Sequence, residues 1–403
     1  MSNYHANLCQ VIVTCALLST LATAADQGPA PRIVPPVDES HLTVLKGNTH
    51  PLARAQFDQG VAPPDLPMQR MLLVLQRSPQ QQSALTQLLE DQQNPASSSY
   101  HRWLTPDQFG RQFGPADQDI QTVTAWLRGH GFEIGSVTKG RTMIEFSGTA
   151  AQVQEAFHTA IHKYVVNGKE HWANASDPQI PVALTPVVAG VHTLHNFLKQ
   201  PMVQLTGQKI TAKLTGGKSP QITLGNGVHA LVPSDFATIY NLNPLYNKSA
   251  PIAGPFVSVG VVGRSDLYRG GEDLYYFDEY FVGASHAVGP SNIVLNGPNP
   301  GNLGGGEEVE ATLDLSWAHS VASDTTTQFV LSASTNTTDG VDLSELYIVD
   351  NNLTDVMTES FGRCEAGTTS AEEQGIAMLA EQAAAQGISY VVAAGDTWRG
   401  GLR

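Results

Sequence analysis

Residues 67–198 alternate between stretches of helical and of strand-like hydrophobic spacing. Thr105 followed by Pro106 predicts the start of a helix, and Asn167-Gly168 predicts the turn of a hairpin. We expect strands at 71–78, 132–137 and 142–148, a hairpin at 162–175, and helices at 80–95, from 106, at 117–130 and at 150–157. This mixture of short strands and helices predicts a compact α+β domain.

From about residue 231 the pattern changes to continuous apolar runs that alternate with helical spacing. Such runs indicate strands that are buried on both faces of a sheet. We expect strands at 256–263, 327–334, 355–362 and 388–396, and helices at 307–321 and 370–387, the second with Ser370 as N-cap and Gly387 just past its end. The order predicts an α/β fold with a doubly wound parallel sheet, in which chemistry gathers beyond the carboxyl ends of the strands.

The N-terminus carries an apolar run at residues 8–22 that ends in the small-x-small sequence Ala22-Thr23-Ala24. This pattern is typical of a secretory signal peptide, so we expect an exported protein, either extracellular or periplasmic. No Lys or Arg precedes the run, which leaves a membrane anchor as the alternative reading. No later stretch is apolar enough to predict a membrane span.

Composition narrows the function classes. The 403 residues hold 22 basic and 37 acidic side chains, a net charge of −15, which argues against nucleic-acid binding because that needs a basic face. Two of the three cysteines, Cys9 and Cys15, lie in the signal segment, so Cys364 is left alone. An unpaired cysteine in an exported protein suggests an absent partner; the alternative is a buried, inert side chain.

The most informative segment is Glu310-Ala-Thr-Leu-Asp314, whose spacing puts two carboxylates on one face of a helix. Like charges so close raise one of the two pKa values, and carboxyl pairs with separated pKa values suit acid–base catalysis. The alternative is a solvated acidic helix start. Asp396 follows an apolar strand directly, where catalytic groups of α/β sheets lie; it could equally cap the next helix.

Three other segments resemble functional motifs but are weaker evidence for a functional site. His158 and His162 have zinc-helix spacing but lack the following Glu and a third ligand. Ser370 is better explained as a helix cap than as a nucleophile. The glycines at 304–306 are not a phosphate-binding loop, because no Gly-Lys-Ser/Thr follows.

Taken together, several motifs resemble the sedolisin family, the secreted serine-carboxyl peptidases with a subtilisin-like fold. The activation domain of that family is matched by Tyr100-His-x-x-Leu-Thr-Pro and Phe109-x-x-x-Phe113-Gly-Pro, and its acid pair by Glu310-x-x-x-Asp314. Further matches are Tyr240-Asn-Leu, the strand at 259–267, Ser360-Phe-Gly and Ala394-Gly-Asp396. The resemblance covers residues 65–396 and implies five parts: a signal peptide at 1–24, a leader at 25–66, an activation domain at 67–199, a linker with the maturation cleavage at 200–229, and the first part of a peptidase domain at 230–403.

The resemblance also implies roles. Glu310 would be the general base, Asp314 would hydrogen-bond and orient it, and Asp396 would donate to the oxyanion while neutral, which fits an enzyme working in acid. The family's serine nucleophile and calcium ligands are expected beyond Arg403, together with a cysteine that would pair with Cys364. We therefore expect a zymogen of an acid endopeptidase, a monomer acting on proteins and peptides, which is inactive as this chain alone. The alternative is a non-catalytic inhibitor or chaperone of a full-length relative.

Overall fold

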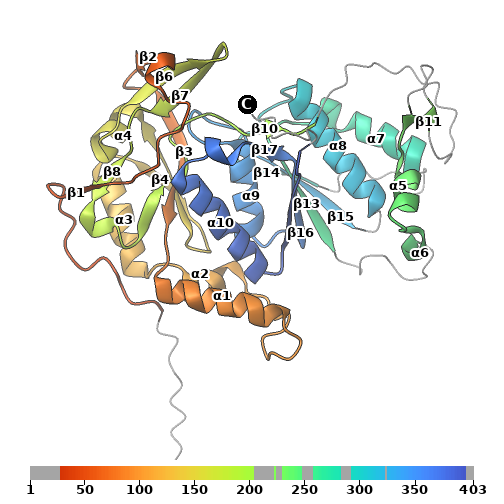
Figure 1. The fold of residues 1–403 in the computed structure, drawn as a ribbon, viewed down its shortest axis with the longest axis horizontal. Coiled ribbons are helices and arrows are strands. Elements are labelled where there is room, and N and C mark those ends of the chain that lie inside the picture. Colours follow the sequence, from red (N-terminus) through yellow and green to blue (C-terminus); the bar gives the residue numbers. More distant parts are fainter. Residues whose placement is uncertain are drawn as a thin grey trace, which may run out of the picture.

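The computed structural model describes residues 28–203, 222–223, 229–246, 257–282, 292–322 and 325–395. The predicted signal peptide, most of the linker and Asp396 lie outside these residues. The described chain forms two halves joined near residue 200, with α9 (Gly340–Asp350) and α10 (Ser370–Ala385) between their sheets (Figure 1).

The N-terminal half is built on an antiparallel sheet of four strands in the order β4-β5-β3-β9. Their bounds are Glu133–Val137, Met143–Thr149, Pro67–Leu75 and Val188–Val191. The central strand β3 is buried on both faces, because Met71 and Leu73 join one core while Leu72 and Val74 join another. The first core lies under α3 (Asp117–Gly129) and α4 (Ala150–Phe157), and the second includes residues of α9 and α10.

Helices and turns of this half follow the local sequence signals. Helix α1 (Pro79–Gln93) ends at Asn94, and α2 (Pro106–Phe113) begins with Thr105 and Gln108 bonded to each other's backbone N–H groups. The hairpin of β6 (Ile161–Val166) and β7 (Lys169–Asn174) turns at Asn167-Gly168. These predictions are confirmed.

The segment before residue 67 is less irregular than its composition suggests. Within it, β1 (Leu42–Val44) pairs with β8 (Gln179–Pro181), a 3-10 turn covers Ala55–Phe57, and β2 (Asp58–Val61) pairs with β6. These strands are only three or four residues long, too short for a periodic pattern to identify.

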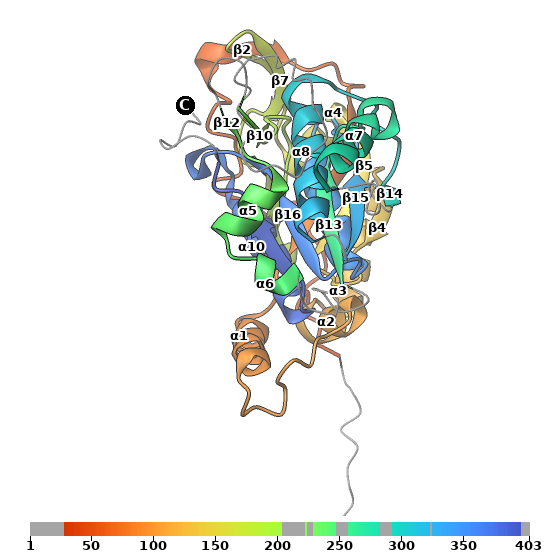
Figure 2. The ribbon, with the colours of Figure 1, turned by 90° about the vertical axis from the view of Figure 1, so that its right-hand side faces the viewer.

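The C-terminal half contains a parallel sheet of five strands in the order β14-β15-β13-β16-β18. The bounds are Asn292–Leu295, Thr326–Leu331, Ser258–Gly263, Val356–Glu359 and Ser389–Val392. Neighbouring residues of β13 point to opposite faces: Val261 joins the core under α8 (Gly305–Val321), and Val262 joins the core shared with α9 and α10. Helices on both faces confirm the predicted α/β fold, and α7 (Glu272–Phe277) and α8 lie on the side facing the viewer in Figure 2.

The remaining described elements are short. They are 3-10 turns at Val182–Leu184, Tyr268–Gly270 and Glu365–Gly367, a π-helical turn at Asp278–Val282, helices α5 (Pro233–Ile239) and α6 (Asn243–Tyr246), and strands β10 (Gln200–Pro201), β11 (Ile222–Thr223), β12 (His229–Ala230) and β17 (Phe361–Gly362). None of the helices in the described ranges is long and apolar enough to cross a membrane.

Five details differ from the sequence-based expectation. Thr369, not Ser370, caps α10, because its side chain accepts from the N–H of Glu372, while Gly387 has the expected positive φ. Helix α8 starts two residues early, at Gly305, and α9 was not predicted. Among the described residues the apolar strand β18 is at the edge of its sheet, and Val391 and Val392 are about half exposed rather than buried. The predicted strand at 355–362 is interrupted at Ser360.

Candidate active site

Glu310 lies on α8 near the carboxyl ends of the central parallel strands. Gly304 caps this helix with a positive φ of 69°, which a residue with a side chain rarely adopts, so the glycines serve the turn into α8 rather than a phosphate. Glu310 is only 3% exposed, and its Oε2 accepts a hydrogen bond from the backbone N–H of Val203 at 2.5 Å. A buried carboxylate thus faces the backbone of the segment that leaves the N-terminal half.

Asp314 lies one turn further along α8, on the same face as Glu310. Its Oδ1 accepts a hydrogen bond from the Ser360 hydroxyl at 2.8 Å, while its Oδ2 is buried and has no hydrogen-bond partner in the described part of the chain. Burial raises the pKa of the Asp314 carboxyl to about 6, against the opposing effect of the Ser360 hydrogen bond. The structure therefore supplies a carboxyl that is protonated in mild acid next to the Glu310 position.

The chain segment at residues 200–203 crosses this acid pair as an added strand. Residues Gln200 and Pro201 form β10, which pairs antiparallel with β17, and the N–H of Met202 donates to the Ser360 carbonyl at 3.0 Å. The Met202 side chain fills space that glycines leave open, since a Cβ at Gly362 would lie 3.2 Å from its Sδ and one at Gly395 would collide with its Cε. Gly395 immediately precedes Asp396, which lies outside the described residues, so its predicted role is not placed.

This arrangement has the parts for proton transfer at a peptide bond. A carboxylate contacts a backbone nitrogen, a second carboxyl of raised pKa lies one turn away, and the peptide is held in an extended conformation by strand pairing. Sequence reasoning identified Glu310 and Asp314 but missed Ser360 and Val203 as their partners. Ser360 lies near the carboxyl end of the predicted strand 355–362, which is a weak local signal. Nothing in the sequence around Val203 indicates its contact with Glu310.

The weaker sequence candidates do not form a site. His158 ends α4 with a positive φ of 51°, and His162 lies on β6 with its Nδ1 2.8 Å from Asp58 Oδ2, so the two do not share a helix face. Ser370 is the first residue of α10, and its N–H donates to the carbonyl of Gly47. The described ranges contain no group of three or more His, Cys, Asp or Glu side chains arranged to hold a metal ion. Cys364 is exposed and free, which excludes the buried alternative.

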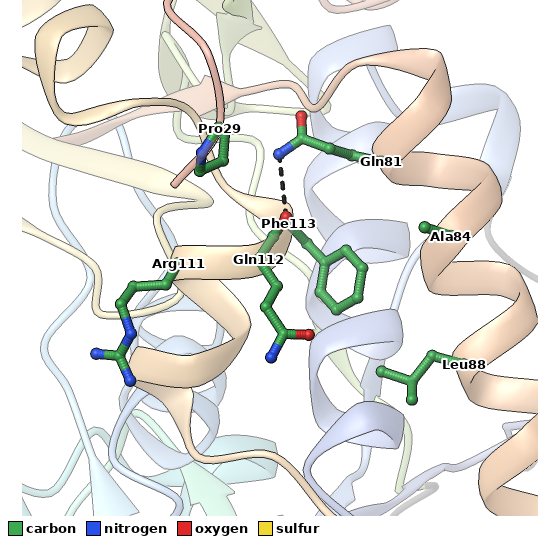
Figure 3. A pocket seen from close by; sticks show the side chains of 7 residues that line it. All are labelled: Pro29, Gln81, Ala84, Leu88, Arg111, Gln112 and Phe113. Carbon is green, nitrogen blue, oxygen red and sulfur yellow. Dashed lines mark hydrogen bonds between the residues drawn. The ribbon is translucent and has the colours of Figure 1, made fainter. Parts of the chain in front are cut away.

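A surface pocket between α1 and α2 is remote from this chemistry (Figures 1 and 3). Its lining consists of Pro29, Gln81, Ala84, Leu88, Arg111, Gln112 and Phe113. Arg111 is the one charged side chain among them, and Gln81 is held by the Gln112 and Gly114 carbonyls. The pocket therefore offers no acid–base pair.

Comparisons with known proteins agree with the two-part fold. Residues 56–197 match the family described as "Pro-kumamolisin, activation domain". The chain is 28% identical over 329 residues to sedolisin of Pseudomonas sp. (strain 101), covering 78% of this chain and 52% of that protein. It is 27% identical over 335 residues to xanthomonalisin of Xanthomonas sp. (strain T-22), covering 78% and 38%, and 25% identical over 342 residues to human tripeptidyl-peptidase 1, covering 83% and 57%.

An activation domain joined to an α/β half with a buried acid pair defines a precursor protein of two parts. Residues 56–197 match the activation domain, and the chain is similar to sedolisin and xanthomonalisin over 78% of its length. It spans about half the length of the curated relatives that it matches.

Proposed function

We propose that this chain is the precursor of a secreted serine-carboxyl endopeptidase that hydrolyses proteins and peptides at acid pH. The observation that carries the proposal is the buried Glu310 carboxylate in contact with the Val203 backbone N–H, with Asp314 one turn away. The raised pKa of Asp314, about 6, supports function in acid, because the carboxyl then holds a proton at the pH of catalysis.

Each acidic side chain has a distinct part in the proposed reaction. Glu310 accepts the proton of a serine hydroxyl and returns it to the leaving nitrogen. Protonated Asp314 donates a hydrogen bond to Glu310 and fixes its orientation. Asp396, neutral in acid, donates to the oxyanion of the tetrahedral intermediate.

The N-terminal half acts as inhibitor and chaperone in this proposal. Residues 200–203 occupy the strand position beside β17 that a substrate would need, which supports inhibition. The sheet of the N-terminal half also packs Leu72, Val74 and Met143 into the same core as α9 and α10, which supports a chaperone role for folding.

The nucleophilic serine is the missing part. The proposed reaction needs a serine that follows Asp396 in the chain, and residues 397–403 contain none. The complete precursor should contain the serine in a Gly-Thr-Ser turn, a cysteine partner for Cys364, and an acidic calcium site, and should act as a monomer.

Reading the gene past the Arg403 codon in all frames, followed by expression of the extended precursor, tests the proposal. A Gly-Thr-Ser segment and peptide release from acid-denatured protein are the expected results. If the extended reading frame carries neither a serine turn nor activity, the peptidase proposal is wrong. A tight complex between this chain and an active relative would then favour an inhibitor.

A further inference from the structure

We propose that the Met202–Val203 peptide bond is the bond at which the precursor cuts itself, and that the acidic pocket around Lys199 is a substrate subsite for a basic side chain. The residue that this subsite binds lies three positions before the residue whose carbonyl carbon is attacked, as Lys199 lies three positions before Met202. This inference rests on the proposed peptidase function.

The position of the bond follows from three contacts along one strand. Antiparallel pairing places Gln200 opposite Gly362 and Pro201 opposite Phe361. Met202 then donates its N–H to the Ser360 carbonyl, and the next N–H, that of Val203, donates to Glu310 Oε2. The chain is thus held by backbone hydrogen bonds up to Met202, and the first nitrogen beyond it meets the proposed general base.

The chemistry identifies the same bond. The serine hydroxyl adds to the Met202 carbonyl carbon and passes its proton to Glu310. Glu310 gives that proton to the Val203 nitrogen as the C–N bond breaks, which leaves a free Val203 amine and an acyl-serine. Water then releases Met202 as a carboxylic acid. In the structure the Val203 N–H donates to Glu310 Oε2 at 2.5 Å, so the carboxyl that returns the proton already lies beside this nitrogen.

Lys199 enters a pocket made by the C-terminal half. Its Nζ lies 2.6 Å from Glu359 Oε1, 2.9 Å from Asp342 Oδ1 and 3.5 Å from Glu345 Oε2, and the residue is 5% exposed. The Tyr390 hydroxyl lies 2.7 Å from Glu345 and 2.8 Å from Glu359, which fixes both carboxyls in place. Burial alone would lower the pKa of Lys199, but the three carboxyls raise it, so the side chain is a cation.

The cation and the carboxyls of this pocket come from different parts of the chain, which indicates a subsite. The carboxyls and the tyrosine belong to α9, β16 and β18, whereas Lys199 belongs to the segment that leaves with the activation domain. His192 of the activation domain, 3.2 Å from Asp342, leaves with it too. After departure Arg363 of the C-terminal half still acts on Asp342, but the carboxyls lose Lys199 and His192 and become open to water. A substrate lysine in the same register would restore the ion pairs with Asp342 and Glu359.

Two measurements test the inference. In the 403-residue chain, Lys199→Ala empties the pocket, and we expect n-butylammonium to raise its melting temperature saturably while n-butanol does not. Lys163→Ala, which removes the partially exposed partner of Glu170, is the control and should not respond. An absent response, or an equal response to the alcohol, overturns the subsite.

In the extended precursor, the processed product should begin at Val203. Lys199→Glu should slow processing by about 30-fold or more, as for the loss of one partner in a buried charge pair, and Lys163→Glu should not. A different new N-terminus, or unchanged processing by Lys199→Glu, overturns the inference. If the unaltered precursor does not process itself, the proposed peptidase function is wrong. The titration with n-butylammonium then still tests whether the pocket binds a basic side chain.

Discussion

Asp314 should destabilise the folded chain at neutral pH. Replacing it by Asn keeps an oxygen for the Ser360 hydroxyl and removes the buried ionisation. The rise of its pKa from 3.8 to about 6 corresponds to about 3 kcal/mol against the ionised form in the folded state. Because the folded-state pKa is raised, this cost is present above pH 6 and disappears as the pH falls towards 3.8.

The assay is urea unfolding followed by tryptophan fluorescence at pH 7.5 and pH 4. We expect Asp314→Asn to be more stable than the unaltered chain by up to about 3 kcal/mol at pH 7.5, and by less than about 1 kcal/mol at pH 4. Asp65→Asn, at an exposed position, is the matched control and should show no such pH dependence. If the difference in unfolding free energy between Asp314→Asn and the unaltered chain is constant with pH, or grows in acid, Asp314 is not a buried acid of raised pKa.

Two further predictions concern the contact between the halves. Burial, followed by the charge of His195, lowers the pKa of His50 to about 3, so stability should fall as the pH drops from 6.5 towards 3. His50→Phe keeps the ring stacking on Phe197 and should remove about 2 kcal/mol of the loss between pH 7 and 5, measured by urea unfolding. Gly375→Ala should lower the melting temperature, because its Cβ would lie 2.6 Å from His192 Nδ1; Gly129→Ala, with open space around it, should not. A raised melting temperature for Gly375→Ala would contradict this packing.

The sequence predicts those elements that are marked by residues close together in the chain. Capping residues marked α1 and α2, and the i, i+4 spacing correctly put Glu310 and Asp314 on one helix face. Helix α9 gave no such signal, because Asp342, Ser344 and Glu345 are buried along with its apolar side chains and blur the amphipathic stripe.

The partners of the site could not be predicted because they are distant in the chain. Ser360 lies 46 residues from Asp314, and Val203 lies 107 residues from Glu310. Lys199 precedes Asp342 by 143 residues and Glu359 by 160, and in the sequence each of these carboxyls resembles an ordinary surface charge. Burial of a charge depends on the packing of whole elements, which no short pattern encodes.

The proposed function depends on Glu310 as the general base. The most direct measurement compares self-processing and hydrolysis of acid-denatured protein by the extended precursor and its Glu310→Ala variant. Glu308→Ala, which removes a nearby carboxylate on the same helix, is the control. We predict that Glu310→Ala loses both activities by more than about a hundred-fold while the activation domain stays folded, and that Glu308→Ala keeps them. If Glu310→Ala keeps more than about a hundredth of the activity, Glu310 is not the general base.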